Sequence, residues 1–362
     1  MRVLVVNAGS SSLKVRLLDH DDALLAQRDL PALRGRADEA ALTDALAELP
    51  APDAIGHRVV HGGARSRPVM MDAEVVAELH ALTALAPLHQ PPALEAHAVV
   101  AAALPGVPAV ACFDTAFHTT LPEPAATYAL PRAWRERWPL RRYGFHGLSH
   151  AYVARRAAEL TGRPVGELRT VSCHLGAGAS LCAIAGGRSV HTTMGFTPLE
   201  GLVMATRSGS IDPGLVLWLV EEGGLAPADV AHALEHESGL QGLTGSSDMR
   251  VVTARAQRGD AEAALGLDVY ADRLRGAIGS MAVALGGVDV LAFTGGVGEH
   301  AAELRARVAG RLGLLGIGID RERNAADPMD ADVGAADATV RTLVITARED
   351  LEVARQVRAL NP

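Results

Sequence analysis

The sequence predicts an α/β fold made of two duplicated domains, and three features indicate it. Short β-branched runs alternate with longer segments of helical periodicity along the chain, a pattern typical of sheets covered by helices. Two hairpins of the same plan lie about half a chain apart, which suggests an internal repeat. The length of 362 residues exceeds the usual size of one hydrophobic core, so two domains are expected.

The first hairpin opens the chain. Residues 2–6 form a short apolar run, and residues 7–12 carry the small polar residues of a tight turn. Residues 13–18 then alternate between apolar and basic side chains, which predicts a strand with one buried face. Lys14 is therefore expected just past the turn, pointing away from the apolar face.

The second hairpin repeats this plan in the middle of the chain. Residues 170–174 predict a strand, residues 175–179 a turn and residues 180–185 the returning strand. Aligning the two turns places Ala177 over Gly9, so the two hairpins are interpreted as matching parts of two related domains.

The segments between the hairpins predict two buried strands, at residues 55–60 and 109–113, and a helix at residues 72–85. Residues 121–142 contain four prolines, so this stretch is predicted to be mostly loop. It ends in a predicted hinge at residues 143–147.

The second half predicts a helix through residues 274–285, a buried strand at 288–294, a glycine loop at 295–299 and a further helix. A strand followed by a glycine loop and a helix can place a nucleotide at a helix N-terminus. The last strand is expected at residues 340–345, and a closing helix is expected to pack on another domain. The predicted domains are residues 1–148, completed by residues 349–362, and residues 149–348.

Composition excludes several classes of protein. The net charge of −8 and the aromatic content of 3% argue against nucleic-acid binding, which needs a concentrated basic surface. Proline, aspartate or glycine interrupts the longest apolar stretches, so no membrane span is predicted. The three cysteines form no C-x-x-C pair, which favours a reducing compartment and a cytoplasmic location.

Lys14 is the only lysine in the chain, and every other strongly basic side chain is arginine. A bias against lysine explains the arginines but not the single exception, although chance survival is an equally simple interpretation. Because lysine is a compact point charge that suits a phosphate in a tight loop, its position beside a glycine-serine turn favours a phosphate contact.

Three loops rich in glycine or serine follow strands, at residues 7–12, 175–179 and 295–299. Small residues let backbone N–H groups converge on phosphate oxygens, so three such loops indicate a nucleoside polyphosphate. None of them matches the P-loop pattern or the dinucleotide fingerprint. The chain is therefore expected to bind a nucleoside polyphosphate by a different type of site.

Four side chains near strand ends are candidates for phosphoryl-transfer chemistry, which needs cations around the moving group and an aligned acceptor. They are Arg58, Asp114, His146 and Arg207. Each has a structural alternative, since arginines beside glycines stabilise loops and an aspartate after a strand often caps a turn. His57 and His61 raise the alternative of a metal site, but strand-like surroundings make their spacing a poor chelate.

Taken together, these segments resemble the acetokinase family, which includes acetate kinase. The resemblance runs in order from residue 3 to near the end of the chain. It is carried by segments 3–14, 56–63, 85–89, 113–118, 143–147, 174–176, 194–201, 206–213 and 293–299, and by Glu349.

The resemblance implies the fold of actin, sugar kinases and heat-shock ATPases, in which two duplicated domains face each other across a cleft. It implies reversible phosphoryl transfer from ATP to acetate, giving acetyl phosphate and ADP, with Mg²⁺ as cofactor and Mn²⁺ as an alternative ion. It also implies a homodimer. Propionate or another short-chain carboxylate is the alternative substrate, since one methylene separates substrates by only about 1–3 kcal/mol.

The resemblance also implies roles for individual residues. Asp114, His146 and Arg207 are expected to be catalytic, and Asn7 and Glu349 to lie near the metal ion. The expected substrate-binding residues are Arg58, Val60, Leu88, Phe145 and Pro198. The expected nucleotide-binding residues are Ser10, Ser12, Lys14, His174, Leu175, Gly176, Ala177, Gly178, Asp248, Met249, Arg250, Gly296, Val297, Gly298, Glu299 and His300.

Asp114 needs a physical qualification. A carboxyl group beside arginines is expected to have a lowered pKa and to be ionised at neutral pH. Orienting the acceptor or a cation suits an ionised Asp114 better than proton donation, because the carboxylate substrate is already an anion and needs no base. Its expected role is catalytic, and acid–base chemistry stays open as the alternative to orientation.

The chain departs from the family pattern mainly on the nucleotide side. Ala177 and His300 stand where asparagine is usual, which leaves nucleotide preference open. Two rival hypotheses are a nucleotide-dependent switch on the same fold and a sugar kinase. The apolar Val60, Leu88 and Phe145 argue against a sugar pocket.

Overall fold

The computed structural model describes residues 1–9, 12–33, 36–87, 89–326 and 329–360. By its contacts the chain divides into two compact units. Unit 1 comprises Met1–Thr119, Phe145–Tyr152 and Arg348–Pro362, and unit 2 comprises Thr120–Gly144 and Val153–Ala347. The domain limits given above stay a prediction, and the two units are described separately below.

Unit 1 is built on one mixed sheet, in which the described strands follow the order β4-β3-β2-β1-β5-β7-β6. The hairpin β1–β2 is antiparallel, whereas β5 and β7 run parallel to β1. The strands are β1 (Val3–Ala8), β2 (Ser12–Leu18), β3 (Leu24–Leu33), β4 (Arg36–Ala37), β5 (Ala54–Val59), β6 (Val69–Met70) and β7 (Ala109–Phe113).

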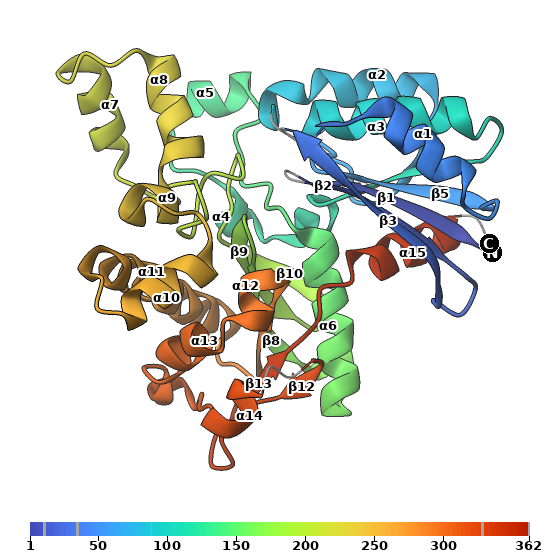
Figure 1. The fold of residues 1–362 in the computed structure, drawn as a ribbon. Helices are drawn as coiled ribbons and strands as arrows, with labels where there is room; N and C mark the ends of the chain where they lie inside the picture. Colours follow the sequence, from blue (N-terminus) through green and yellow to red (C-terminus); the bar gives the residue numbers. More distant parts are fainter. Residues whose placement is uncertain (10–11, 34–35, 88, 327–328, 361–362) are drawn as a thin grey trace. The chain divides into compact units, whose positions relative to one another are not determined.

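Helices cover both faces of this sheet (Figure 1). One face packs on α1 and α3 through a cluster that includes Leu4, Val6 and Leu13, and the other packs on α15 through Val3 and Val5. This alternation follows from the two-residue period of a strand. The helices are α1 (Glu39–Ala47), α2 (Ala73–Ala81), α3 (Gln90–Ala103) and α15 (Glu349–Leu360), and α6 (Gly147–Thr161) begins in this unit.

Unit 2 contains a second mixed sheet, with described strands in the order β10-β9-β8-β11-β13-β12. Its strands are β8 (Arg169–Leu175), β9 (Ala179–Ala185), β10 (Arg188–Thr192), β11 (Val290–Thr294), β12 (Ala331–Asp332) and β13 (Arg341–Val344). The hairpin β8–β9 is antiparallel, and β11 and β13 run parallel to β8. This arrangement matches that of β1, β2, β5 and β7, so the predicted repeat of the hairpins extends to the neighbouring strands.

The helices of unit 2 are mostly short, apart from α11, which packs on β9 and β10 and lies beside α10 and α13 (Figure 1). They are α4 (Glu123–Ala126), α5 (Arg132–Arg137), α7 (Pro213–Glu221), α8 (Pro227–His232), α9 (Gly239–Thr244), α10 (Met249–Gln257), α11 (Ala261–Leu285), α12 (Gly295–His300), α13 (Ala302–Ala309) and α14 (Arg321–Ala325).

Three predicted elements differ from the structure. The helix expected at 72–85 ends at Ala81, and a separate 3-10 turn follows at Thr83–Leu85. The stretch 121–142 is not all loop, because α4 and α5 start directly after Pro122 and Pro131. A proline is tolerated there because the first N–H groups of a helix have no intrahelical partner.

The third difference is the glycine segment 295–299, which was predicted as a loop and forms helix α12. The buried guanidinium of Arg305 donates hydrogen bonds to the carbonyl oxygens of Gly298 and Glu299, at 2.8 Å and 2.5 Å. A cation on the last carbonyls of a helix stabilises its C-terminal end. This side-chain contact offsets the low helix propensity of glycine, and the glycine pattern alone does not reveal it.

Among the described residues, no helix is long and apolar enough to cross a membrane.

Candidate functional site

The candidate site of unit 1 begins with a row of three polar side chains across the sheet. Lys14 on β2 is paired in register with Asn7 on β1, and Asn7 is paired with Arg58 on β5. Registered neighbours point to the same face of a sheet, which here is the face that carries α15. As predicted, Lys14 is exposed, whereas Leu13 and Val15 on either side of it are buried.

Arg58 holds Asp114, the residue that follows β7. Its Nη2 donates to Oδ2 at 2.6 Å, and its Nε lies 3.2 Å from each carboxylate oxygen. The Asp114 side chain is 1% exposed and that of Arg58 is 12% exposed. Two predicted site residues that lie far apart in the sequence therefore form one buried ion pair.

The ionisation of Asp114 differs from the sequence-based expectation of a lowered pKa. Removal from water raises the pKa of Asp114, and the charge and hydrogen bonds of Arg58 only partly oppose this effect. Burial likewise disfavours the charged form of Arg58, but the carboxylates of Asp114 and Glu349 more than offset it and raise the pKa of Arg58. The correction follows from burial, which a linear sequence does not show.

Asn7 and Glu349 also meet in unit 1, at the start of α15. The amide Nδ2 of Asn7 donates to Glu349 Oε2 at 2.9 Å, and Asn7 Oδ1 accepts from Arg58 Nη1 at 3.1 Å. The Arg58 Nε lies 3.9 Å from Glu349 Oε2. The two residues predicted to lie near a metal ion are therefore joined to each other and to Arg58.

These oxygens fit a magnesium ion that is held mainly by a substrate. Mg²⁺ binds hard oxygen donors and is commonly held by one or two carboxylates together with phosphate and water. Glu349 supplies one part-buried carboxylate and Asn7 one amide oxygen. Within the described ranges there is no group of three or more His, Cys, Asp or Glu residues that could hold a metal by themselves.

His146 lies in a turn beside Asp114. Its backbone N–H donates to the Asp114 carboxylate, and the N–H of Gly147 donates to the Asp114 carbonyl oxygen at 2.9 Å. His146 adopts a positive φ of 57°. The neighbouring Phe145 and the residue Val60, both predicted pocket walls, are buried in the same unit.

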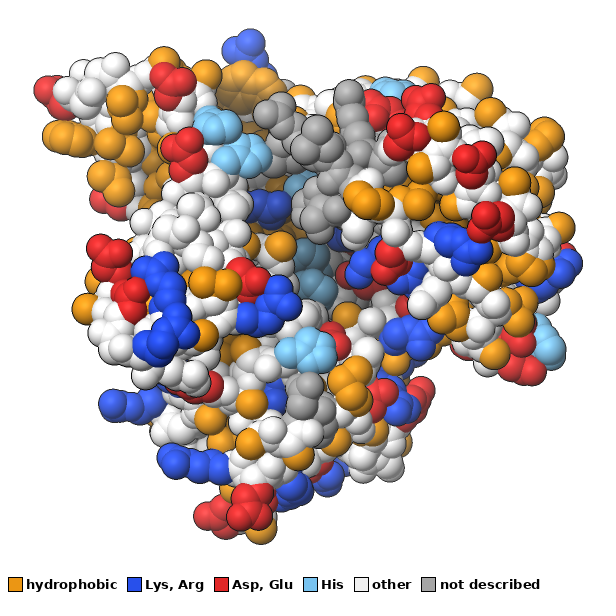
Figure 2. Space-filling model, viewed as in Figure 1, with side chains coloured by type: hydrophobic (Ala, Val, Ile, Leu, Met, Phe, Trp, Pro, Cys, Tyr) orange, Lys and Arg blue, Asp and Glu red, His pale blue; other side chains and the backbone are white. Residues whose placement is uncertain are grey.

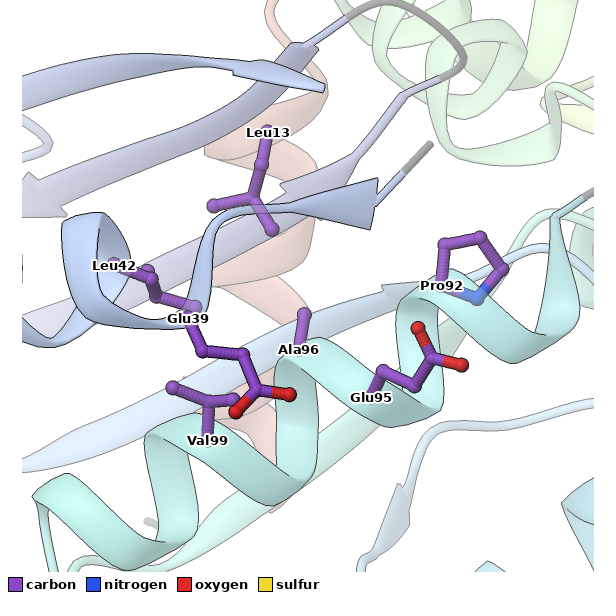
Figure 3. A pocket seen from close by; sticks show the side chains of 7 residues that line it. All are labelled: Leu13, Glu39, Leu42, Pro92, Glu95, Ala96 and Val99. Carbon is purple, nitrogen blue, oxygen red and sulfur yellow. The ribbon is translucent and has the colours of Figure 1, made fainter. Parts of the chain in front are cut away.

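A hollow of unit 1 lies on the other face of the sheet, which α1 and α3 cover (Figure 3). Leu13 on β2 faces α1 and α3 there, and the carboxylates of Glu39 and Glu95 lie at its edge (Figure 3). Leu13 belongs to the apolar cluster under α1 and α3, whereas Lys14 is on the other face. This pocket is therefore separate from the row of Lys14, Asn7 and Arg58.

Unit 2 holds Arg207 and Pro198 close together. The Nη1 of Arg207 donates to the Pro198 carbonyl at 3.3 Å and lies 3.8 Å from the Met204 sulfur. Burial lowers the pKa of Arg207, and the charge of Glu235 opposes this. An arginine in such surroundings keeps its charge, because the ordinary pKa of arginine is far above neutral pH.

The predicted nucleotide segments 174–178 and 296–300 are also neighbours in unit 2. Thr294 is paired with His174 in the sheet, and α12 packs on the end of β8. Gly295, between them, has a φ of +78°, and a Cβ at this position would lie 2.7 Å from the carbonyl oxygen of Leu175. Only glycine permits this approach.

Asp248 and Arg250 lie at the start of α10. Asp248 caps this helix by accepting from the Arg250 N–H at 2.9 Å, and their side chains form an ion pair with a 2.6 Å contact. The side-chain hydrogen bond from Arg250 is the main cause that lowers the pKa of Asp248 to about 2. Met249 between them is buried.

Two predicted site residues, Ser10 and Leu88, lie outside the described residues. The other predicted residues fall into two sets. Unit 1 contains Asn7, Ser12, Lys14, Arg58, Val60, Asp114, Phe145, His146 and Glu349. Unit 2 contains Pro198, Arg207, 174–178, 248–250 and 296–300.

Sequence reasoning missed three residues whose side chains contact and position parts of these sites. His118 contacts the Phe145 carbonyl, and Arg305 holds α12. Glu200 joins Tyr128 and Arg142, at 2.5 Å and 2.6 Å, under the loop that carries Pro198. His118 and Glu200 lie inside motifs already noted, but only their partners reveal what they do.

These observations define the class of the protein. Two sheets of matching topology, a buried arginine-carboxylate pair and a glycine-bearing strand-helix junction define an α/β phosphotransferase with a duplicated fold.

Comparison with known proteins specifies the class further. A family model described as the acetokinase family matches residues 32–355. The chain is 46% identical over 387 residues to an acetate kinase of Leifsonia xyli subsp. xyli, covering 98% of this chain and 97% of that protein. It is 50% identical over 302 residues to an acetate kinase of a Synechococcus strain, covering 83% and 74%. The chain belongs to the acetokinase family, whose members are carboxyl-group phosphotransferases.

Solved structures agree with this assignment. The acetate kinase of Porphyromonas gingivalis matches with a TM-score of 0.90 at 34% identity, over 100% of both chains. A propionate kinase of Francisella tularensis matches with a TM-score of 0.91 at 34% identity, over 99% of both chains. These matches confirm the predicted class of two duplicated domains with the fold shared by sugar kinases and actin-like ATPases.

Proposed function

We propose that this protein transfers a phosphoryl group reversibly between ATP and acetate, giving acetyl phosphate and ADP. The observation that carries the proposal is the buried Arg58, which is joined to Asp114, Asn7 and Glu349 at the carboxyl ends of β1, β5 and β7. This arrangement provides a fixed cation and acceptor-orienting oxygens where a small anion can bind. The relatives described above are acetate and propionate kinases, which supports the same chemistry.

In this proposal Arg58 binds the anionic end of acetate or acetyl phosphate. Its own pairing with Asp114 fixes the guanidinium plane, so little reorganisation is needed when the substrate binds. Asp114 orients Arg58 and takes no proton from the acceptor, because acetate is already ionised. Val60, Leu88, Phe145 and Pro198 are the proposed walls for the methyl group.

The charge that develops on the transferred group needs further cations. His146 and Arg207 are the proposed stabilisers, and one well-placed arginine contributes roughly a thousandfold or more to phosphoryl transfer. Lys14 and Ser12 are the proposed phosphate contacts of unit 1. Mg²⁺, or Mn²⁺ in its place, would be held by Asn7 and Glu349 and would supply further neutralisation of phosphate charge.

The nucleotide is assigned to unit 2. Residues 174–178 and 296–300 present backbone groups beside the Gly295 junction, and small residues there leave room for a nucleotide. Asp248, Met249 and Arg250 complete the proposed set. Ala177 and His300 depart from the family pattern, so ATP should be compared with GTP as phosphoryl donor.

The proposal is tested by assaying the reverse reaction with acetyl phosphate, ADP and Mg²⁺, and the forward reaction with acetate, propionate and butyrate. The expected result is ATP formation from acetyl phosphate and the highest kcat/KM on acetate, with propionate second. A clear preference for butyrate would overturn the substrate assignment. Unchanged transfer in Arg207→Ala would instead favour a nucleotide-dependent switch.

We also propose a homodimer that forms through helix α7. The side chains of Leu215, Leu217 and Trp218 are 46%, 60% and 56% exposed, and hydrophobic side chains gather over this helix (Figure 2). A second copy that presents the same apolar side chains would cover this surface by isologous contact. Light scattering should give twice the chain mass, and Leu217→Glu should give monomers; a monomeric parent protein would reject the dimer.

A cytoplasmic location is proposed for the reaction, because ATP and ADP are its nucleotides. The free thiols of Cys112, Cys173 and Cys182 are consistent with a reducing compartment.

A further inference from the structure

The peptide unit between Phe145 and His146 is held at both of its polar ends. Its carbonyl oxygen lies 2.9 Å from Nε2 of His118, and its N–H donates to the carboxylate of Asp114. A carbonyl oxygen can only accept, so Nε2 of His118 must carry the proton. One peptide group thus links a buried histidine to the proposed catalytic carboxylate.

This peptide stands in a restricted backbone conformation. His146 has a φ of 57°, and only Asp22 and Asp330 share a positive φ among the described non-glycine residues. Such a conformation is unfavourable for a residue with a side chain and is retained where surrounding contacts determine it. Turning the peptide over would withdraw both of its hydrogen bonds.

The next residue fixes the turn to Asp114 a second time. The N–H of Gly147 donates to the Asp114 carbonyl at 2.9 Å. A Cβ on Gly147 would lie 2.1 Å from the same oxygen, so only glycine fits. The turn therefore donates hydrogen bonds to both the backbone carbonyl and the side-chain carboxylate of Asp114, and Arg58 on β5 donates to the same carboxylate.

We propose that His118 is a positioning residue for this site. Its Nε2–H holds the Phe145–His146 peptide so that the His146 N–H is directed at the Asp114 carboxylate and His146 starts from a fixed backbone. His118 is 1% exposed, and hydrogen bonds in series strengthen one another in such dry surroundings. The kinetic part of the inference rests on the proposed function.

The hydrogen bonds from His118 through the Phe145–His146 peptide to Asp114 form a relay. Few titratable groups surround this relay in the described part of the chain. Arg58 and Glu349 act on Asp114, and the ring of His150 on α6 lies 5.7 Å from the ring of His118. Burial lowers the pKa of His118 to about 4, and the hydrogen bond to Phe145 opposes this. His118 is therefore a neutral donor at the pH of an ordinary assay.

The test compares His118→Phe, which keeps a ring without a donor, with His118→Gln, whose Nε2 can donate from a similar place. His118→Phe is expected to lower kcat roughly tenfold, the effect of about 1.4 kcal/mol on a barrier, while KM for ATP changes less than twofold. In a plot of kcat against pH, the fall of kcat on the acid side (the acid limb) should move to higher pH in His118→Phe. The reason is that the ionised Asp114 carboxylate loses a hydrogen-bond donor that stabilises it. His118→Gln should restore both values.

A second readout needs no turnover. With ¹⁵N-histidine labelling, 14 histidines give a tractable spectrum, and the His146 amide is assigned by its loss in His146→Asn. The His146 amide proton should be shifted downfield in the parent protein and in His118→Gln. It should move upfield in folded His118→Phe and in Asp114→Asn.

The outcomes separate this inference from the proposed function. Loss of the amide shift in His118→Phe supports the relay even if no carboxylate is phosphorylated. The inference is overturned if His118→Phe leaves the His146 amide proton shift, kcat and the acid limb of kcat all unchanged, even if the enzyme is an active acetate kinase. If His118→Phe does not fold, a folded His118→Gln that lacks the downfield amide overturns it as well.

Discussion

The two units share a sheet topology but present different chemistry at matching places. In unit 1 the row across β2, β1 and β5 is Lys14, Asn7 and Arg58. In the matching strands of unit 2, β9, β8 and β11, the registered row near the same end is Ser180, His174 and Thr294. Unit 1 therefore carries a lysine and an arginine in this row. Unit 2 carries neither there, and it has glycines directly after β8 (Gly176) and β11 (Gly295).

This difference teaches how a duplicated fold can divide the tasks of phosphoryl transfer. Charged side chains suit the acyl phosphate and the metal ion, whereas bare backbone and small residues suit a nucleotide. The following predictions test that division, beginning with the largest expected effect.

Arg58→Ala should cause the largest loss. It removes the proposed substrate cation and leaves the Asp114 carboxylate buried without its partner. We expect kcat/KM for acetate to fall by at least about a thousandfold and the free energy of unfolding to fall by about 3–5 kcal/mol. Steady-state kinetics and urea unfolding measure the two effects. Arg28→Ala, which removes an arginine from an exposed pair with Glu48, is the control; an equal loss there would contradict the assignment.

Gly295→Ala should weaken nucleotide binding in unit 2 without altering the row of Lys14, Asn7 and Arg58 in unit 1. A Cβ would lie 2.7 Å from the Leu175 oxygen in a backbone with a φ of +78°. We expect KM for ATP to rise roughly tenfold, equivalent to about 1.4 kcal/mol of binding, and KM for acetate to stay within twofold. Gly276→Ala in α11, which meets nothing within 4 Å, is the matched control and should leave both values unchanged. A rise in KM for acetate alone would reverse the assignment of the two units.

Acid should weaken unit 1 before unit 2. Burial lowers the pKa of His57 to about 3 and the pKa values of His61 and His118 to about 4. Since these values lie below the unfolded value of 6.5, the unfolded chain binds protons first, and stability present above pH 6.5 is lost as pH falls toward 4. Each histidine contributes a slope of up to about 1.4 kcal/mol per pH unit.

The three tryptophans, Trp134, Trp138 and Trp218, all lie in unit 2. Their fluorescence should therefore change at a lower pH than far-ultraviolet circular dichroism, which reports both units. His57→Gln should reduce the slope of stability against pH. Coincident transitions with the parent slope in that variant would show that the buried histidines are not the cause.

Asp248→Ala should give the smallest effect. Asp248 caps α10 and pairs with Arg250, so loss of the cap should cost about 1 kcal/mol of stability. KM for ATP should change less than threefold, because the carboxylate is already engaged by Arg250. Asp248→Asn should keep the cap; a tenfold change in KM for ATP would make Asp248 a direct nucleotide contact instead.

Much of the fold followed from the sequence because its signals are local. Alternating residues predicted β2 and its exposed Lys14, and the repeated hairpin predicted the second sheet. The short helices α4 and α5 were missed because the prolines that mark loops also precede the first turn of a helix. Helix α12 was missed because the side chain of Arg305 binds its last carbonyls, which the glycine pattern does not reveal.

For the site, the sequence predicted which residues take part but not their electrostatics. Motif resemblance named Arg58, Asp114, Asn7 and Glu349, and the structure brings these four together. Their electrostatics were not predictable, since the pKa of Asp114 depends on burial and moves in the direction opposite to the expectation. The partners of His118 were also hidden, because they arise from a turn formed 27 residues further along the chain.

The most direct test of the division between units is calorimetric titration of ADP into folded Arg58→Ala and Gly295→Ala. We predict that Arg58→Ala binds ADP within twofold of the parent affinity, whereas Gly295→Ala binds it roughly tenfold more weakly, a difference of about 1.4 kcal/mol. Loss of ADP binding in Arg58→Ala with parent-like binding in Gly295→Ala would contradict the account.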